Sequence, residues 1–266
     1  MSNPMSRGEL WLEMLVPDAK RIEGLCPSVQ VADGELNGET VRFIAVVPDA
    51  HNHYPRAVKG EVGLLEGWWL AKVVSEVIAT DTDQVVKRPI VAVIDVPGQS
   101  YGRREEGFGI HQALAGAAAA YASARLAGHS VIGLIVGKAM SGAFLAHAYQ
   151  ANRLIAFNDK GVLIHAMGKE SAARITLRTV ESLEKLAATI PPMAYDISNY
   201  ATLGLLSNLL DISNPDAPSA NDLALVKTTL QQAIHDARQD PTLKNRLGAE
   251  NRRSSALVRE HMRAGW

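Results

Sequence analysis

The sequence predicts an α/β fold, and three observations lead to that prediction. Segments rich in β-branched residues alternate with segments whose apolar residues recur at helical spacing, which is the pattern of a sheet covered by helices. Neither a fixed-period repeat nor a low-complexity linker interrupts the 266 residues. The composition, 47% hydrophobic and 21% charged, is sufficient for one buried core. We therefore expect a single domain over residues 1–266, with helical extensions at both ends.

The first half of the chain predicts a hairpin between two helices. Residues 7–15 form a short amphipathic pattern that predicts a helix. Residues 29–33 and 41–47 are the predicted strands of the hairpin, because the segment between them is rich in Gly and Asn, which tolerate positive φ. Residues 60–79 carry apolar side chains along one broad face and predict a longer helix.

The second half of the chain predicts the centre of the sheet. Residues 89–96 are mostly β-branched, which is typical of a strand covered on both faces. A glycine-containing loop at 97–109 leads into a helix of small residues at 110–126. Beyond Gly168 the chain is predicted to be mainly helical and to close with two helices. The other predicted elements are strands at 130–136, 153–157 and 162–166 and a helix at 141–150.

Charge and cysteine content exclude several classes of protein. The formal net charge of −1 argues against a nucleic-acid binder, which usually carries a basic excess. The single cysteine, Cys26, rules out an intrachain disulfide and fits a reducing compartment. Residues 1–15 lack the features of a signal peptide, and the longest apolar stretches are too short to span a bilayer. We therefore expect a cytoplasmic protein that does not bind membranes.

The most informative motif is the end of an apolar strand followed by a predicted helix that begins with Ser141 and Gly142. Backbone N–H groups of such a turn have no intrahelical partner, and the helix dipole adds partial positive charge. The N–H groups of Ala139, Met140 and Gly142 are therefore candidates for binding an anion, and one well-placed donor stabilises an oxyanion by about 3–4 kcal/mol. The alternative is that Ser141 only caps the helix and Gly142 only permits tight packing.

A second motif is the histidine that ends a β-branched strand, His165. A polar residue at the exit of a strand is well placed to face a cleft. Ser141 and His165 could form a nucleophile–base pair, or an oxyanion site with a proton donor. The alternative is that His165 is a hydrogen-bonded structural residue.

The third candidate is the loop at 97–109. Gly98 and Gly102 suit a crossover near a ligand. Glu106, beside Glu105, could supply acid–base chemistry, although adjacent carboxylates are usually only solvated.

Other motifs are missing from the sequence. It contains no Walker A motif, no Gly-x-Gly-x-x-Gly after a strand, and no Gly-x-Ser-x-Gly around Ser141. His51 and His53 have no obvious third ligand, so we expect no metal site.

Three segments between residues 91 and 178 resemble the carboxyltransferase subunits of acyl-CoA carboxylases, in the half that handles carboxybiotin. They match that family's Asp-Thr-Pro-Gly…Gly…Glu…Gly crossover, its Gly-Glu-Gly-Gly-Ser-Gly-Gly-Ala-Leu-Ala turn and the glycine of its Ser-Pro-Glu-Gly segment. The matching residues are Asp95, Pro97, Gly98, Gly102, Glu106 and Gly109, then Gly137, Ser141, Gly142 and Leu145, and finally Gly168. The resemblance implies a crotonase/ClpP-like ββα superhelix with a helical C-terminal region.

The sequence departs from that family's pattern at two places. Ala139 and Met140 replace the paired glycines that let biotin approach the backbone, and His165-Ala166-Met167 replaces Ser-Pro-Glu. As a whole, the chain is similar to the gamma subunit of biotin-independent malonate decarboxylase. This similarity implies a lyase that is active as a hetero-oligomer with a beta subunit, and no cofactor bound by this chain. It also implies an acyl-carrier protein subunit with a CoA-derived arm and an acyl-carrier transferase subunit.

The reaction that this resemblance implies is decarboxylation of malonyl-S-acyl-carrier protein to acetyl-S-acyl-carrier protein and CO₂. Cleavage of the bond to the carboxylate leaves an enolate, which backbone donors stabilise more in the transition state than in the ground state. Our hypothesis is that N–H groups around Ser141 bind an anion and that His165 manages the proton. Because related carboxyltransferases have one such site in each subunit, this chain would hold the departing carboxylate and the beta subunit the thioester oxygen.

Three other interpretations stay open. Residues 137–141 also resemble the Gly-Gln-Ala-Ala-Ser nucleophile turn of the ClpP peptidases, and Ile164-His165 resembles their Ile-His, which would indicate a serine hydrolase. The chain could also be a biotin-dependent carboxyltransferase subunit, or a scaffold whose partner performs the chemistry.

The basic stretch at 241–266 fits an acidic partner or a phosphate-bearing carrier, or a solvated helix face.

Overall fold

A computed structural model describes residues 5–266 and confirms the predicted α/β fold. Its sheet has the strand order β1-β2-β3-β4-β5-β7, and β6 pairs with β4 beyond the end of β5. Strand β1 is antiparallel to β2, whereas the other pairs are parallel. The strands are β1 (Val29–Leu36), β2 (Glu39–Val46), β3 (Ile90–Val96), β4 (Val131–Met140), β5 (Arg153–Phe157), β6 (Ile164–His165) and β7 (Asn208–Leu210).

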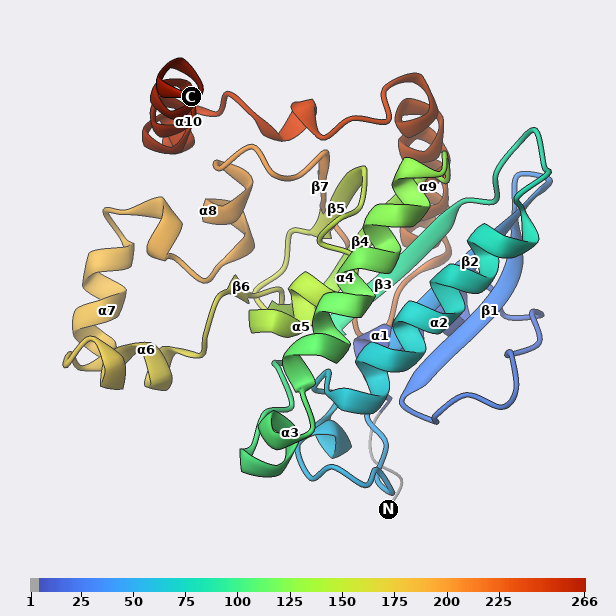
Figure 1. The fold of residues 1–266 in the computed structure, drawn as a ribbon, viewed down its shortest axis with the longest axis horizontal. Coiled ribbons are helices and arrows are strands. Elements are labelled where there is room, and N and C mark those ends of the chain that lie inside the picture. The colour runs from blue at the N-terminus through green and yellow to red at the C-terminus, as the bar shows by residue number, and fades with distance from the viewer. Residues whose placement is uncertain (1–4) are drawn as a thin grey trace.

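Helices cover both faces of this sheet. In Figure 1, α2 and α4 lie in front of the strands, and α1 and α9 lie behind them. The α-helices are α1 (Arg7–Leu15), α2 (Leu64–Thr80), α3 (Arg103–Gly107), α4 (Ile110–Leu126), α5 (Ser141–Ala146), α6 (Lys169–Ile175), α7 (Val180–Ala187), α8 (Ile197–Ala201), α9 (Ala220–Gln239) and α10 (Arg253–Gly265). In the described part of the chain, none of them is long and apolar enough to cross a membrane.

The predicted hairpin is present and has a two-residue turn. Asn37 and Gly38 both have positive φ, 54° and 76°, which is the requirement of the turn that best matches the twist of paired strands. The predicted helix at 7–15 is confirmed as α1, where the Ser6 hydroxyl accepts a hydrogen bond of 3.2 Å from the N–H of Glu9.

The centre of the sheet also follows the prediction. All strand residues of β3 except Asp95 are fully buried, in agreement with a strand covered on both faces. The helix predicted at 110–126 is α4, with the same bounds. It packs closely on α2 because Gly67 has no side chain, since a Cβ there would lie 2.8 Å from the carbonyl of Ala113.

Two predicted boundaries are wrong around the main motif, and one strand elsewhere was not predicted. Strand β4 continues to Met140, because Asp95 Oδ1 accepts the N–H of Lys138 at 3.0 Å beside a register shift and because β6 pairs with the strand's last residues. The helix predicted at 141–150 ends at Ala146, since Ala148 has φ 67°. The short strand β7 was not predicted, because its three residues carry no clear pattern.

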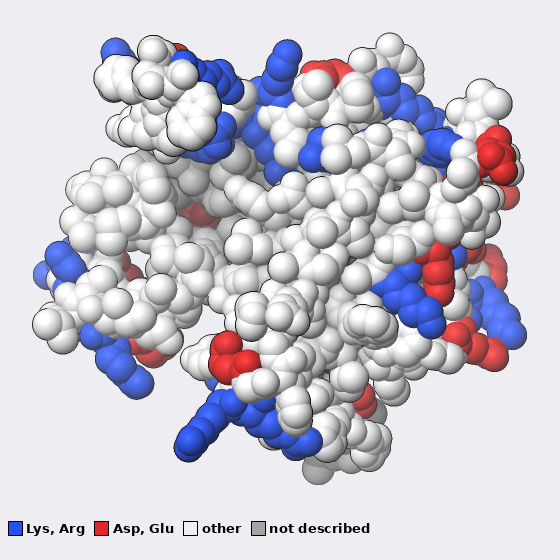
Figure 2. Space-filling model, in the orientation of Figure 1, with Lys and Arg blue, Asp and Glu red and all other residues white. Residues whose placement is uncertain are grey.

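Helices α6 and α7 form an arm that lies apart from the helices on the sheet (Figure 1). The arm has a small apolar core of its own, in which Ala172, Ala173 and Leu183 are buried. Figure 2 shows a hollow between this arm and the rest of the molecule, with mostly uncharged surface around it.

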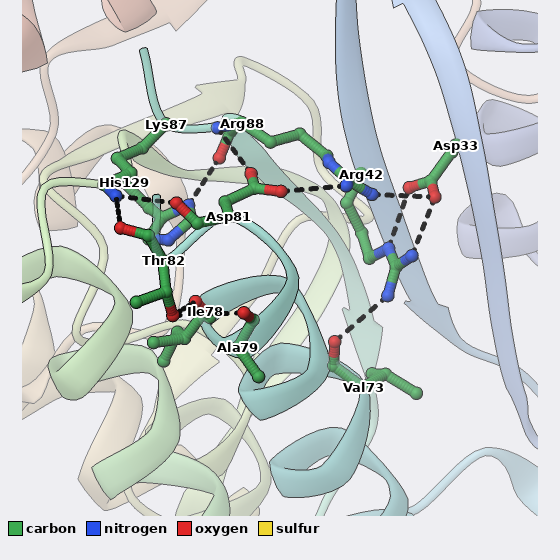
Figure 3. Close-up of polar contacts among 10 residues, drawn as sticks. All are labelled: Asp33, Arg42, Val73, Ile78, Ala79, Asp81, Thr82, Lys87, Arg88 and His129. Atoms are coloured by element: carbon green, nitrogen blue, oxygen red, sulfur yellow. Dashed lines mark hydrogen bonds and ion pairs between the residues drawn. The ribbon is translucent and has the colours of Figure 1, made fainter. Parts of the chain in front are cut away.

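A network of ion pairs ties the amino-terminal ends of the strands together (Figure 3). Arg42 donates two hydrogen bonds to Asp33, at 2.7 and 2.8 Å. Arg88 lies 3.0 Å from both Asp33 and Asp81, and its carbonyl contacts Nδ1 of His129 at 2.8 Å. Burial raises the pKa of Asp33, but hydrogen bonds and charges from Arg42 and Arg88 outweigh this, so that its pKa lies below the ordinary value.

Candidate active site

The structure brings Ser141 and His165 together at the carboxyl edge of the sheet. Met140 is the last residue of β4 and lies in register with His165 on β6, so Ser141 follows directly beside the histidine. Both residues line one cavity of about 310 Å³. The carboxyl edge of a parallel sheet is the usual place for a ligand, so this juxtaposition makes the cavity the candidate site.

Tyr149 and Tyr200 supply the other hydroxyl groups around this cavity. Most of the remaining lining is apolar and includes Phe144, Ile164 and Leu203. An apolar cavity with a few convergent polar groups is typical of sites that bind small molecules.

Ser141 has a strained backbone at the entry to α5. Its φ is 61°, whereas Met140 before it is extended, and such a conformation costs a residue other than glycine about 1–3 kcal/mol. The N–H of Ser141 faces the carbonyl of His165, because Met140 and His165 are paired in parallel register. Within residues 5–266, no hydrogen-bond acceptor faces the N–H of Gly142. A Cβ on Gly142 would collide with Oε1 of Gln99, so a larger residue would require that side chain to move. The turn therefore presents the unpaired N–H of Gly142 to the cavity.

Two predicted donors do not fit this arrangement. The N–H of Ala139 donates to the carbonyl of Leu163 at 2.8 Å, because β4 continues past the expected turn and pairs with the chain before β6. The N–H of Met140 faces the carbonyl of Val96, because Val96 and Ala139 are paired in parallel register. Ala139 and Met140 are therefore unavailable as anion-binding groups, and the candidate donor is Gly142.

His165 is half-buried, and its ring is fixed on two sides. Its Nδ1 lies 3.1 Å from the carbonyl oxygen of Met167 and 3.3 Å from the amide nitrogen of that residue. Its ring stacks on Tyr195, with centroids 3.9 Å apart and planes at 13°. Burial lowers the pKa of His165 below its ordinary value, and the hydrogen bond to Met167 opposes this only in part. The imidazole is therefore neutral near pH 7.

Ser141 and His165 are not joined as a preformed pair. Among the described residues, neither the Ser141 hydroxyl nor Nε2 of His165 has a hydrogen-bond partner. In the tautomer that donates from Nδ1 to the carbonyl of Met167, rather than accepting that residue's N–H, Nε2 is available for a proton. In that tautomer the site can exchange a proton with a bound molecule, beside the N–H of Gly142.

The loop at 97–109 contributes less to the cavity than expected. Gly98 accepts the N–H of Val62 at 3.0 Å, and Gly102 precedes α3. Glu106 is exposed on α3, and none of the three lines the cavity. Glu105, the neighbouring carboxylate, is the buried one.

Sequence reasoning missed the residues that complete the site. Tyr195 and Tyr200 come from the chain between α7 and the end of α8, and Tyr149 follows α5. Gln99 comes from the loop after β3 and contacts Gly142. The sequence gives no local signal for them, because each is brought to the site by contacts distant in the chain.

One of the two histidines considered for metal binding, His53, contacts an arginine. Nε2 of His53 lies 2.7 Å from the Arg104 guanidinium. Across residues 5–266, no three His, Cys, Asp or Glu side chains are grouped for a metal ion.

Comparison with known proteins gives consistent results along the chain. A family model described as malonate decarboxylase gamma subunit matches residues 57–266. A Malonomonas rubra protein, named malonyl-S-ACP:biotin-protein carboxyltransferase, is 33% identical over 189 residues. That match covers 70% of this chain and 65% of the relative, so the chain matches less than two thirds of the relative's length.

Solved structures resemble the whole chain. The chain superimposes on a subunit of a Pseudomonas malonate decarboxylase hetero-tetramer, solved with coenzyme A, with a TM-score of 0.95 and 58% identity over 98% of this chain and 100% of that one. A hetero-dimer of the Pseudomonas enzyme gives a TM-score of 0.91 and 55% identity over 98% and 99%. Transcarboxylase 12S, at 21% identity and a TM-score of 0.64 over 84% of this chain and 39% of that one, shares the carboxyltransferase fold.

Proposed function

Because the chain belongs to the family of malonate decarboxylase gamma subunits, we propose that it forms an active site together with a beta subunit. The complex converts malonyl-S-acyl-carrier protein to acetyl-S-acyl-carrier protein and CO₂. The observation that carries this proposal is the cavity at the carboxyl edge, where Ser141 and the unpaired N–H of Gly142 lie beside His165. The heterodimeric Pseudomonas relative supports the need for a partner subunit.

The reaction breaks one carbon–carbon bond of the malonyl group. The electron pair of that bond moves into the thioester as an enolate, and the carboxylate leaves as CO₂. One proton then adds to the enolate carbon and gives the acetyl thioester. We assign the N–H of Gly142 to positioning the carboxylate before it leaves. We assign the thioester oxygen, where the enolate charge develops, to the beta subunit, because donors aimed at developing charge lower the barrier.

His165 supplies that proton from Nε2. The imidazole is neutral in the free chain, because burial lowers its pKa. A bound malonyl carboxylate or enolate places negative charge beside the ring, and an opposite charge at this distance raises the pKa of an imidazole. Substrate binding thus favours the protonated imidazole of His165, and the enolate carbon then takes that proton.

The remaining assignments follow from the same family membership. The malonyl group arrives on an acyl-carrier protein with a CoA-derived arm, which an acyl-carrier transferase subunit prepares. This chain binds no cofactor of its own, acts as a carboxy-lyase subunit and works in the cytoplasm.

The test is an assay of CO₂ release by the reconstituted complex. The chain is co-expressed with its beta subunit and given a malonyl thioester, with neither biotin nor metal added. We expect stoichiometric CO₂ and acetyl thioester, and no turnover by either subunit alone. Release of CO₂ at the same rate from the beta subunit alone would show that this chain is only a scaffold.

Carboxyl transfer to biotin is a second candidate, because the Malonomonas rubra relative is named a biotin-protein carboxyltransferase. Ala139 and Met140 replace the glycines expected for biotin, which favours direct release of CO₂. Inhibition of the complex by avidin, or carboxylation of added biotin, would establish the second candidate instead.

A serine hydrolase is the third candidate, since the strained φ of Ser141 is typical of a nucleophile held at a sharp turn. The absence of a hydrogen bond from the Ser141 hydroxyl to His165, in the residues described, counts against it. Labelling of Ser141 by a fluorophosphonate probe would support a hydrolase.

A further inference from the structure

We propose that Tyr195 is a positioning residue, whose ring fixes the His165 imidazole so that Nε2 stays directed at the reacting atoms. This inference deepens the proposed function and rests on the role given there to His165. It concerns a residue 30 positions further along the chain, which no motif of the sequence marks.

Backbone pairing sets the position of the Tyr195 ring. The N–H of Ile164 donates to the carbonyl of Tyr195 at 2.9 Å, and Leu163 and Asp196 form an antiparallel bridge. Two adjacent connections therefore hold the segment of Tyr195 alongside the strand that carries His165. The rings meet face to face at 3.9 Å and 13° as a result.

The stack leaves His165 one productive orientation. Met167 already holds the Nδ1 edge of the imidazole, at 3.1 Å from its carbonyl. A half-turn of the ring would break that bond and would direct Nδ1 into the cavity. A tilt of the ring would break the contact with Tyr195, which as a stacked pair contributes about 0.5–1.5 kcal/mol. Both constraints together keep Nε2 as the nitrogen that faces a ligand.

Tyr195 is not an ordinary core residue. His165 and its 310 Å³ cavity lie on one side of it, and a second cavity of about 350 Å³, lined by Tyr195 and Lys169, lies on the other. The Tyr195 hydroxyl is buried and, among the described residues, has no hydrogen-bond partner. Neither dense packing nor a hydrogen bond of the hydroxyl explains why a tyrosine stands at position 195. We therefore assign its role to the aromatic ring.

Charged groups of the arm back the other face of this ring. Nζ of Lys169 lies 5.5 Å from the Tyr195 centroid and pairs with Glu184 of α7 at 2.7 Å. Glu170 adds a negative charge near the tyrosine hydroxyl, whose pKa is raised by burial and by that charge. The arm of α6 and α7 thus contributes to the site by holding Tyr195 against His165.

Two variants of Tyr195 separate the ring from the hydroxyl. In the complex with the beta subunit, Tyr195→Phe keeps the stack and should leave kcat and KM for the malonyl thioester within twofold of wild type. Tyr195→Leu keeps apolar volume but removes the ring, and should lower kcat about tenfold with KM within twofold. A kcat within twofold for Tyr195→Leu, or equal losses in both variants, would overturn the proposal.

The ¹⁵N spectrum of the histidines reads the imidazole directly. The chain has 8 histidines, and His165→Gln identifies the signals of His165. We expect one tautomer, protonated at Nδ1, in wild type and Tyr195→Phe, and averaged tautomers in Tyr195→Leu. An unchanged tautomer in a folded Tyr195→Leu protein would exclude positioning by the ring. Full decarboxylation by His165→Gln would refute the proposed function instead, while the spectrum would still test the stack.

Discussion

The two ends of the parallel strands are built in opposite ways. At the amino ends, Arg42 and Arg88 pair with Asp33 and Asp81, so each of these charges has a partner of opposite sign (Figure 3). At the carboxyl ends, Ser141 has a strained backbone, and the N–H of Gly142 is unpaired beside a cavity. One end therefore satisfies its polar groups within the chain, whereas the other keeps them available.

The two ends of the strands therefore contribute differently to the stability of the fold. Satisfied buried charges hold strands in place, while breaking one leaves an uncompensated charge. Unpaired donors and strain persist only where the surroundings enforce them, and they concentrate at functional sites. We therefore expect substitutions at the amino ends to change the free energy of unfolding, and substitutions at the carboxyl ends to change turnover.

The largest effect should come from His165→Gln. Loss of the proton donor should lower kcat for CO₂ release by about 10²–10³-fold. The free energy of unfolding should change by less than about 1 kcal/mol, because the side chain is only half-buried. Kinetics of the complex and urea denaturation measure the two quantities. If His165→Gln lowered the free energy of unfolding as severely as it lowered kcat, the proposed difference between the two ends of the strands would be contradicted.

Arg42→Met should have the converse effect. It removes both hydrogen bonds to Asp33, and we expect a loss of about 2–3 kcal/mol in the free energy of unfolding, with unchanged kcat per folded complex. Arg21→Met is the control, because its partner Glu13 is exposed and such pairs contribute less than about 1 kcal/mol. A similar small loss in both variants would mean that the network does not stabilise the sheet.

Acid titration should show a smaller effect at Asp33. Because the folded pKa of Asp33 is depressed, its stabilisation is present above the ordinary pKa of about 3.9 and is lost as pH falls through the folded value. The difference in unfolding free energy between wild type and Asp33→Asn should be about 1 kcal/mol at pH 7 and should shrink below pH 4. A difference that grew as the pH fell would contradict this assignment.

Ser141→Gly should have the smallest effect and the opposite sign. Glycine adopts positive φ without strain, so the variant should gain about 0.5 kcal/mol in stability after the entropy cost of glycine. Lys138→Gly, in the strand before it, should lose about 1 kcal/mol. Thermal unfolding compares the two. A loss in both variants would show that the turn at Ser141 stores no strain.

Much of the fold was predictable because its signals are local. Asn37 and Gly38 define their turn by conformational freedom alone, and β3 and α4 follow from composition and periodicity. The juxtaposition of Ser141 and His165 also follows, since both residues stand at the ends of strands.

The rest depends on contacts between distant segments. Ala139 was expected to be a free donor, but pairing of β4 with the chain before β6 occupies its N–H. Tyr195 reaches His165 only because residues 163–164 pair with residues 195–196. Glu105, rather than Glu106, is the buried carboxylate of α3, which a pair of adjacent identical residues does not reveal.

Deuterium exchange into acetyl-S-acyl-carrier protein tests the role of the carboxyl end most directly, because it follows proton transfer without any cleavage of a carbon–carbon bond. In D₂O, the wild-type complex should exchange the acetyl hydrogens, and Arg42→Met should do so at the same rate per folded complex. His165→Gln should exchange at least about a hundredfold more slowly. Exchange at the wild-type rate in His165→Gln would contradict the account.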